Sequence, residues 1–360
     1  MKRHLFFCLW LVGVFSFGHS LAQESALNPV WKVFITRNLD AQGLARLDFI
    51  QTFDGTQTST EVYGERFTPL HDRLLYFDLQ NRRVMTLRPR GEPQIHPFIF
   101  LPEDAQRIDW LVSADGLRIV WTVTRTSPAG LFTRTEIANL DGSERQVVLE
   151  DGPRAGIRAL PVALSPDNAT LYMDAQPDGL AEFSAYPQYA GLFSVSIWTG
   201  EIATLPGEPS CFCGAGIRAD SFIRLTLNAN LSGFDVRLYD LSRNQSAILP
   251  AFSRTNYTQA GDILIAPDGS QAVYALSRIE NFGALNQSLE TIFVRIDLQT
   301  RTQSPLSEPI TTYVHPVAWT EDNSAILLTS PQENGTWKLN LSDGSLQRIA
   351  SAAYLATLHP

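Results

Sequence analysis

Short apolar runs alternate with turn-forming residues along almost the whole chain. Within Leu164–Met173, Ser165-Pro166-Asp167-Asn168 forms a turn, and Thr170-Leu171-Tyr172-Met173 supplies the apolar and β-branched residues of a strand. The same order of turn and strand recurs at Val112-Ser113-Ala114-Asp115-Gly116, Ile265-Ala266-Pro267-Asp268-Gly269 and Trp319-Thr320-Glu321-Asp322-Asn323. The pattern predicts an all-β chain of strands joined by turns.

The turn aspartates recur with a period near 50 residues. The clear copies are Asp115, Asp167, Asp268 and Asp322. The gap of 101 residues between Asp167 and Asp268 predicts a degenerate copy, which we place at Asp220, and Asp72 is a weaker copy upstream. The successive spacings are then 43, 52, 53, 48 and 54 residues. A period of this length made only of strands is typical of a β-propeller blade.

A second turn follows each anchored strand and predicts an outer hairpin. These turns are Asn139-Leu140-Asp141-Gly142-Ser143, Ile197-Trp198-Thr199-Gly200-Glu201, Asp240-Leu241-Ser242-Arg243-Asn244, Asp297-Leu298-Gln299-Thr300-Arg301 and Asn340-Leu341-Ser342-Asp343-Gly344. Glycine or asparagine suits hairpin positions that need a positive φ. Each unit therefore contains four antiparallel strands, the content of one blade.

The two ends of the chain carry strands that lack partners of their own. Trp31–Thr36 and Ala45–Phe53 predict two strands before the first aspartate anchor, and Ala352–Leu358 predicts a last one. Pairing these ends in one blade would close the ring and remove two exposed edges. This arrangement gives seven blades. The count is six if the N-terminal strands merge with the short unit around Asp72.

The Ser-Pro-Asp-Asn or Pro-Asp-Gly turn followed by a strand resembles the blade signature of TolB-like and WD40-like (PD40-type) β-propeller repeats. The resemblance covers most of residues 60–350. It implies a turn aspartate that caps backbone N–H groups, and a following glycine or asparagine in the left-handed conformation. It also implies a scaffold that binds proteins, peptides or small ligands on its faces or at its channel. Strands begin at Trp31, so only the propeller part of TolB is matched.

The first residues have the pattern of a signal peptide. Lys2 and Arg3 precede an apolar run from Leu5 to Phe17, and Ser20-Leu21-Ala22 offers small residues for cleavage. We expect residues 1–22 to be removed and 23–360 to form one secreted or periplasmic domain; the alternative is an uncleaved anchor. Losing Lys2 and Arg3 changes the net charge from −9 to −11. An acidic chain argues against nucleic acid as a partner, and no later run is long enough to insert into a membrane.

Cys211 and Cys213 are the two cysteines that remain after cleavage. They could form a disulfide with each other, although a one-residue spacer makes a small, strained ring. Inert thiols, redox chemistry and a metal site are the alternatives, and no histidine lies nearby in the sequence to complete a metal site.

A few polar residues outside the repeat are candidates for binding. His315 lies at the start of a predicted inner strand and His96 takes a similar place in its own repeat, so the two could hold a metal at the channel mouth or be unrelated loop residues. Asp174, Asp178 and Glu182 lie on a long loop, Asp174–Gln188, and could bind Ca²⁺ through oxygen ligands, although their spacing matches no calcium loop.

The sequence carries no motif that specifies a reaction. It lacks a Gly-x-Ser-x-Gly nucleophile elbow, a His-Glu-x-x-His pair and a phosphate-binding glycine loop, so we assign no catalytic, cofactor-binding or metal residue. We expect a monomeric, non-enzymatic scaffold that binds a protein, a peptide or a component of the cell envelope. The alternative is an enzyme, a lyase or glycan hydrolase, with its site at the propeller channel. A purely structural module of an envelope assembly is a third hypothesis.

Overall fold

A computed structural model describes residues 29–38, 41, 43–179, 186–206, 214–218, 220–230, 232–252, 254–281, 284 and 286–359. Residues 1–22, Glu182, Cys211 and Cys213 lie outside this part, so the predicted signal peptide and disulfide are not described. Every regular element of the described part is a strand. The described chain holds no helix of the length and apolar character that crossing a membrane requires.

One large sheet joins the two ends of the chain. Its strands, in spatial order, are β27 (Ala353–Leu358), β1 (Trp31–Arg37), β2 (Leu44–Gln51), β3 (Gln57–Pro69), β4 (Leu74–Asp78), β5 (Arg83–Leu87) and β6 (Gln94–Ile95). The N-terminal half of β3 pairs with β2 and its C-terminal half pairs with β4. The sheet therefore contains two groups of four antiparallel strands that share β3. Pairing of Trp31 with Leu358 closes the ring as the sequence predicts.

Five further sheets of four antiparallel strands follow along the chain. The first two sheets consist of β7 (Ala105–Val112), β8 (Arg118–Ser127), β9 (Gly130–Asn139) and β10 (Gln146–Arg154), and of β11 (Ile157–Leu164), β12 (Thr170–Pro177), β13 (Leu192–Ser196) and β14 (Ile202–Thr204). The next two consist of β15 (Ala215–Arg218), β16 (Ser221–Leu227), β17 (Phe234–Asp240) and β18 (Gln245–Phe252), and of β19 (Gln259–Ile265), β20 (Gln271–Glu280), β21 (Ser288–Asp297) and β22 (Thr302–Pro305). The last sheet consists of β23 (His315–Trp319), β24 (Ala325–Thr329), β25 (Thr336–Asn340) and β26 (Leu346–Ala350). The seven-blade and six-blade alternatives thus differ only in whether the large sheet is counted as two blades or one.

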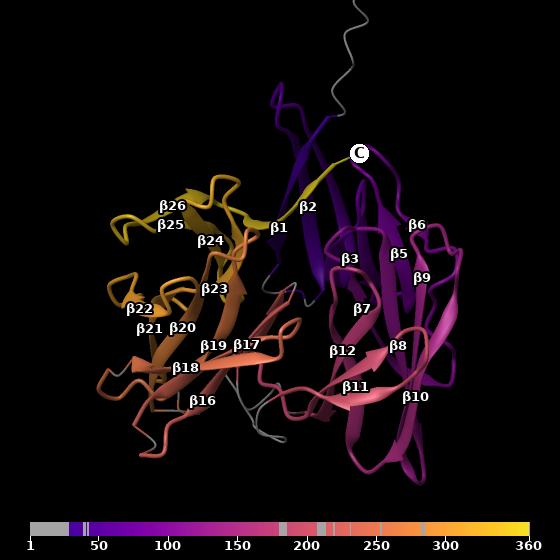
Figure 1. Ribbon diagram of the computed structural model, residues 1–360. Coiled ribbons are helices and arrows are strands. Elements are labelled where there is room, and N and C mark those ends of the chain that lie inside the picture. Colours follow the sequence, from indigo (N-terminus) through magenta and orange to yellow (C-terminus); the bar gives the residue numbers. More distant parts are fainter. Residues whose placement is uncertain are drawn as a thin grey trace, which may run out of the picture.

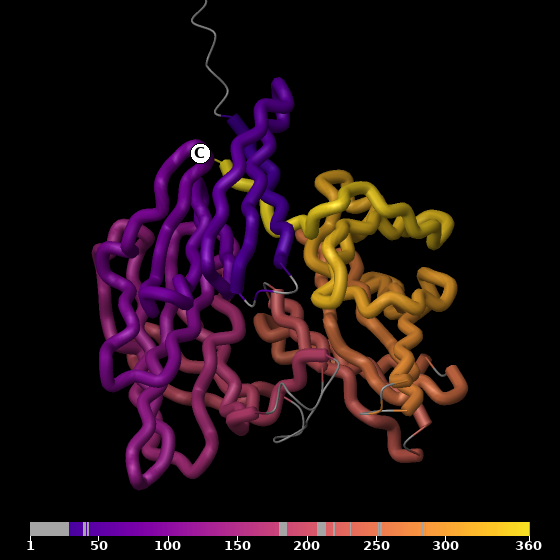
Figure 2. The backbone as a smooth tube through the Cα atoms, turned by 180° about the vertical axis from the view of Figure 1, so that it is seen from behind, coloured from indigo at the N-terminus to yellow at the C-terminus, as the bar shows by residue number. Residues whose placement is uncertain are grey.

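The sheets follow one another around a ring, from the indigo N-terminal strands to the yellow C-terminal strands that return to them (Figures 1 and 2). The first strands of consecutive blades, β7, β11, β15, β19 and β23, are neighbours and form the inner wall. Apolar side chains are buried between adjacent sheets; Phe222 of β16, for example, is fully buried beside Tyr172 of β12. Burial of these faces stabilises each blade against its neighbours rather than in one central core.

The recurring turns have the chemistry that the sequence predicts. The Oδ1 atom of Asp167 accepts hydrogen bonds from the Ser165 hydroxyl at 2.6 Å and from the Ala169 N–H at 3.1 Å. The following Asn168 has a φ of 54°. The weak copy at Asp72 differs, because its carboxylate binds the side chains of Arg73 and Arg88.

These turns mark one face of the ring, which we call the turn face. Each inner strand ends there, because the turn joins it to the second strand of its blade. The start of each inner strand, paired with the end of the second strand, lies at the opposite end of the blade. We call that side the start face.

Candidate functional site

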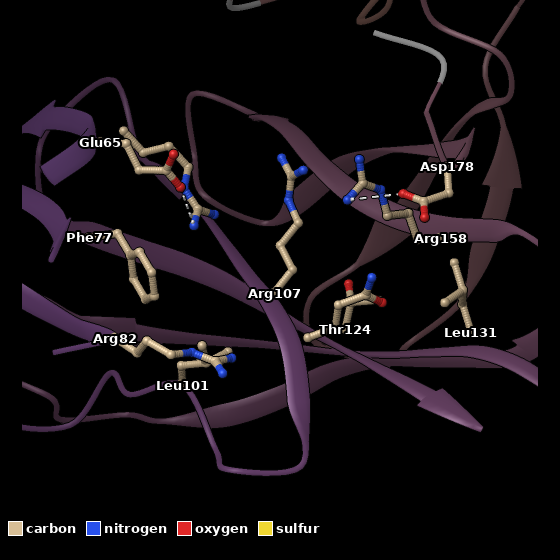
Figure 3. A pocket seen from close by; sticks show the side chains of 11 residues that line it. Glu65, Phe77, Arg82, Leu101, Arg107, Thr124, Leu131, Arg158 and Asp178 are labelled. Carbon is tan, nitrogen blue, oxygen red and sulfur yellow. Dashed lines mark ion pairs between the residues drawn. The ribbon is translucent and has the colours of Figure 1, made fainter. Parts of the chain in front are cut away.

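A pocket of 410 Å³ lies at the start face between the blades of β3, β7 and β11. Four arginines line it: Arg66 on β3, Arg82 in the turn after β4, Arg107 on β7 and Arg158 on β11. Glu65 and Asp178 are the two lining carboxylates. Arg107 stands between the Glu65 side and the Arg158–Asp178 pair (Figure 3). A chain with a net charge of −9 thus gathers positive charge at this one point.

Irregular pairing in two inner strands places the arginines. The register of β3 shifts between Glu65 and Thr68, and Arg66 has a φ of 55°. The register of β7 shifts between Ala105 and Arg107. A β-bulge locally increases twist and changes the direction of a side chain. The bulges therefore account for arginine side chains that meet from separate blades.

Asp109 holds two of the arginines. Its carboxylate accepts hydrogen bonds from the Nε atom of Arg107 at 2.9 Å and from a terminal nitrogen of Arg66 at 3.4 Å. Arg66 also forms an ion pair with Glu65 at 3.1 Å and lies over the rings of Phe77 and Trp110. The Arg66 and Arg107 side chains are consequently fixed in position before any ligand arrives.

The positive charge of Arg158 is balanced much more weakly. Its residue is 6% exposed, and its ion pair with Asp178 spans 3.7 Å. Burial, followed by the nearby Arg107, lowers the pKa of Arg158 below its ordinary value. Its Nε atom has no hydrogen-bond partner among the described residues, and neither does the Nε atom of Arg66 or the hydroxyl of buried Thr124. Buried polar groups are normally satisfied, so these three atoms are places where a ligand could supply a hydrogen-bond partner.

The lining is suited to holding an anion. Guanidinium groups present forked N–H donors that match planar oxyanions, and partial burial strengthens the attraction. Each carboxylate in or beside the pocket is already paired with an arginine. The pocket therefore offers an anion arginine donors in fixed positions.

His315 contributes to a second polar cluster at the start face. It is the first residue of β23, as the sequence predicts, and its Nδ1 atom hydrogen-bonds to Asp262 on β19. The ring of Tyr313 meets the imidazole edge to face at a centroid distance of 4.5 Å. A carboxylate at Nδ1 fixes the orientation of an imidazole, an arrangement seen in acid–base catalysis and in metal sites.

His96 lies in another blade and has a different role. It is buried, follows β6, and its Nδ1 atom accepts hydrogen bonds from the N–H groups of Ile99 at 3.1 Å and Phe98 at 3.4 Å. Burial lowers the pKa of His96 to about 4, with a smaller contribution from Arg73. His96 therefore caps a turn as a neutral side chain and shares no partner with His315.

The proposed calcium ligands are also separated. Asp174 is buried inside β12 and does not lie on a loop as the sequence predicts, and its Oδ1 atom accepts hydrogen bonds from Gly191 N at 2.7 Å and Ala190 N at 3.0 Å. Asp178 faces Arg158, and Glu182 lies outside the described residues. In the described part of the chain, no three histidine, cysteine or carboxylate side chains come close enough to hold a metal ion. The calcium site stays a prediction from sequence.

The long loop after β12 has a structural contact that the sequence does not reveal. Tyr186 is 2% exposed, and its hydroxyl hydrogen-bonds to Ser277 on β20 and to Thr291 on β21. The loop therefore starts in the blade of β11 and reaches the blade of β19, two blades further around the ring. At least this part of the loop is an anchor and not a free recognition surface.

Sequence reasoning missed the arginine pocket. A usable signal exists, because Arg66, Arg107 and Arg158 precede the turn aspartates of their own units by six, eight and nine residues. An arginine near the start of the inner strand in three consecutive units is a pattern that strand formation does not require.

Comparison with known proteins identifies the fold. Structures of prolyl endopeptidases match with a TM-score of 0.62 and 12% identity over 90% of this chain and 50% of theirs. The chain is a β-propeller. Oligogalacturonate lyase in complex with manganese matches at 0.51 and 12% identity over 92% and 98%. TolB from Acinetobacter baumannii matches at 0.43 and 14% identity over 77% and 62%. The propeller thus spans about half of the prolyl endopeptidase chain and less than two thirds of TolB.

The two matches with TM-scores above 0.5 agree with the fold implied by the repeat, and at such identities they establish the fold alone. No protein-family model matches the chain, and no curated protein matches it.

Proposed function

We propose that this protein is a non-enzymatic β-propeller scaffold outside the cytoplasm, which binds a protein, a peptide or a component of the cell envelope at its start face. The observation that carries the proposal is the buried Arg158, whose Nε atom lacks a partner among the described residues beside Arg107. A buried cation whose one ion pair spans 3.7 Å is costly to the folded protein, and a bound anion would lower that cost.

The position of the pocket supports the same proposal. It is open at the end of three adjacent blades, and loops and strand ends on a rigid scaffold are the usual place for recognition. The turn face, by contrast, carries the repeating turns that blade geometry requires.

The test is site-specific photocrosslinking with the full chain. A photoreactive amino acid replaces Gln106, which is exposed and lines the pocket, or Gln299, which is exposed in the turn between β21 and β22. We expect a crosslinked partner from cell-envelope extract with the probe at 106 and none with the probe at 299. Equal crosslinking at both positions, or none at either, contradicts the proposal.

An enzyme is the second candidate, and a specific observation favours it. His315 is hydrogen-bonded to Asp262 and packed against Tyr313, a combination that could move a proton. One structurally similar protein is an oligogalacturonate lyase. The test is to incubate the protein with an anionic polysaccharide and follow the ultraviolet absorbance of unsaturated products. Turnover that is lost in His315→Asn would overturn the scaffold proposal.

A further inference from the structure

We infer that the arginine pocket binds a carboxylate group of a peptide, taken between Arg158, Arg107 and Arg66. This inference rests on the proposed function and names the chemical group that the start face recognises. It follows from three features of the pocket: its charge, its unpartnered donors and its apolar wall.

The balance of charge favours an anion with a single charge. Four arginines line the pocket, and Glu65, Asp178 and the adjacent Asp109 supply three negative charges. One positive charge therefore remains uncompensated. A carboxylate restores neutrality, whereas a phosphate dianion would leave an excess of negative charge among three carboxylates.

The unpartnered donors match a planar acceptor. The Nε atoms of Arg158 and Arg66 are buried without a hydrogen-bond partner in the described structure, as is the hydroxyl of Thr124. Arg107 lies between the two ends of the pocket (Figure 3). Two carboxylate oxygens offer about four lone-pair sites, which is enough to satisfy donors that approach from opposite sides.

The remaining wall favours a peptide over an acidic sugar. Phe77, Leu101 and Leu131 line the pocket beside the arginines, and they suit the methylene groups that precede a carboxylate in a peptide. Thr124 and Gln106 are the uncharged polar side chains of the lining, which is few for the hydroxyl groups of a uronic acid.

The surroundings have room for a chain on one side of the carboxylate. A second pocket of 590 Å³ shares Glu65 and Arg66 with the first and continues over Leu44, Phe67 and Leu355. An extended peptide could therefore place its acidic group in the arginine pocket and neighbouring apolar groups in the second pocket.

The test measures binding of defined peptides to the full-length protein by calorimetry. The probes are an acetylated and amidated pentapeptide with a central glutamate, the same peptide with glutamine, and an acetylated apolar peptide with a free C-terminal carboxylate. Trigalacturonate and inorganic phosphate are the competing ligands. We expect at least one of the two carboxylate-bearing peptides to bind, and the glutamine peptide to bind about tenfold more weakly or not at all. Comparing the glutamate peptide with the peptide that has a free C-terminus shows whether the pocket prefers a side-chain or a C-terminal carboxylate.

The variants locate the site. Arg158→Gln and Thr124→Val should each weaken carboxylate binding, and the valine is nearly isosteric with threonine, so it tests the hydroxyl without disturbing the fold. Arg243→Gln is the control, because Arg243 is a largely exposed arginine in the turn between β17 and β18 on the turn face. We expect this control to bind like the wild type.

The outcomes separate the inference from the proposed function. Tighter binding of trigalacturonate or phosphate than of any peptide overturns the peptide assignment. Peptide binding that is unchanged in Arg158→Gln overturns the site. A crosslinked partner at position 106 without carboxylate dependence contradicts this inference and leaves the scaffold function standing; the absence of both contradicts both.

Discussion

The side chain of Asn168 donates a hydrogen bond from Nδ2 to the Oδ2 atom of Asp115, at 2.6 Å. This contact joins the turn between β11 and β12 to the equivalent turn of the preceding blade. A matching contact runs from Asn323 to Asp268, at 3.3 Å, between the blades of β23 and β19. The recurring turn is thus more than a local blade device, because its asparagine also links one blade to the next.

Asn168 has two separable roles, and substitution can distinguish them. Asn168→Gly keeps the positive φ of 54° and removes the link, so the free energy of unfolding should fall by about 0.5–1 kcal/mol. Asn168→Ala also replaces a residue that tolerates the left-handed conformation with one that tolerates it poorly, and the loss should be about 1 kcal/mol greater. Urea unfolding of the two variants and the wild type measures both differences. Equal losses would show that the conformational role is negligible.

The stability of the arginine pocket provides a second prediction. Arg158 is buried with one distant carboxylate partner, so Arg158→Met should leave the protein unchanged or stabilise it by about 1 kcal/mol. Arg107→Met is the matched comparison, because Arg107 makes 2.9 Å contacts to Asp109. Without Arg107, the negative charge of Asp109 is poorly balanced. That variant should lose about 1–3 kcal/mol. Thermal unfolding of both variants is the measurement; a large loss in Arg158→Met would make Arg158 a structural residue.

His96 gives a pH dependence of stability. Its folded pKa of about 4 lies below the unfolded value of 6.5, so the folded state prefers the neutral imidazole. The associated stability is complete above pH 6.5 and is lost as the pH falls towards 4, by at most about 3 kcal/mol. His96→Asn retains an acceptor near Nδ1 and cannot titrate. Its unfolding free energy should therefore fall less than that of the wild type between pH 6.5 and 4; parallel curves would refute this assignment.

Asp174 should show the opposite dependence. Burial raises its pKa, and its Oδ2 atom lacks a hydrogen-bond partner in the described structure. Because the folded pKa is raised, the contribution to stability is complete below the unfolded pKa and is lost as the pH rises through the folded value. Asp174→Asn keeps an oxygen for the N–H groups of Ala190 and Gly191. Relative to the wild type, this variant should gain stability as the pH rises, as measured by chemical unfolding at several pH values.

The strands and turns were predictable because they depend on residues close in sequence. Asp167 and Asn168, for example, bring the whole turn chemistry within one short stretch, and the repeat then multiplies the signal. The closure of the ring by Trp31 and Leu358 was also predictable, since the unpaired strands at both ends had to find partners.

The arginine pocket was not predictable in the same way. Arg66, Arg107 and Arg158 belong to different blades, and they meet because the ring places their inner strands side by side and bulges redirect two of them. The contacts of Asp174 were also not predictable. The sequence places its polar side chain on a long loop, whereas in the structure it lies on β12 and one of its oxygens accepts hydrogen bonds from the backbone of Ala190 and Gly191.

The anchor formed by Tyr186 depends on a glycine that the repeat pattern does not mark. A Cβ atom at Gly261 would lie 2.4 Å from the Cβ atom of Tyr186, which is too close for either residue to remain in place. Gly261→Ala should therefore displace the loop and reduce the free energy of unfolding by about 1–3 kcal/mol. Tyr186→Phe keeps the ring but removes the hydroxyl that bonds to Thr291, and should cost about 1 kcal/mol. Limited proteolysis distinguishes the variants, because a displaced loop in Gly261→Ala should be cleaved between β12 and β13 much faster than in Tyr186→Phe or the wild type. Equal cleavage rates in all three proteins would show that Gly261 does not hold the anchor.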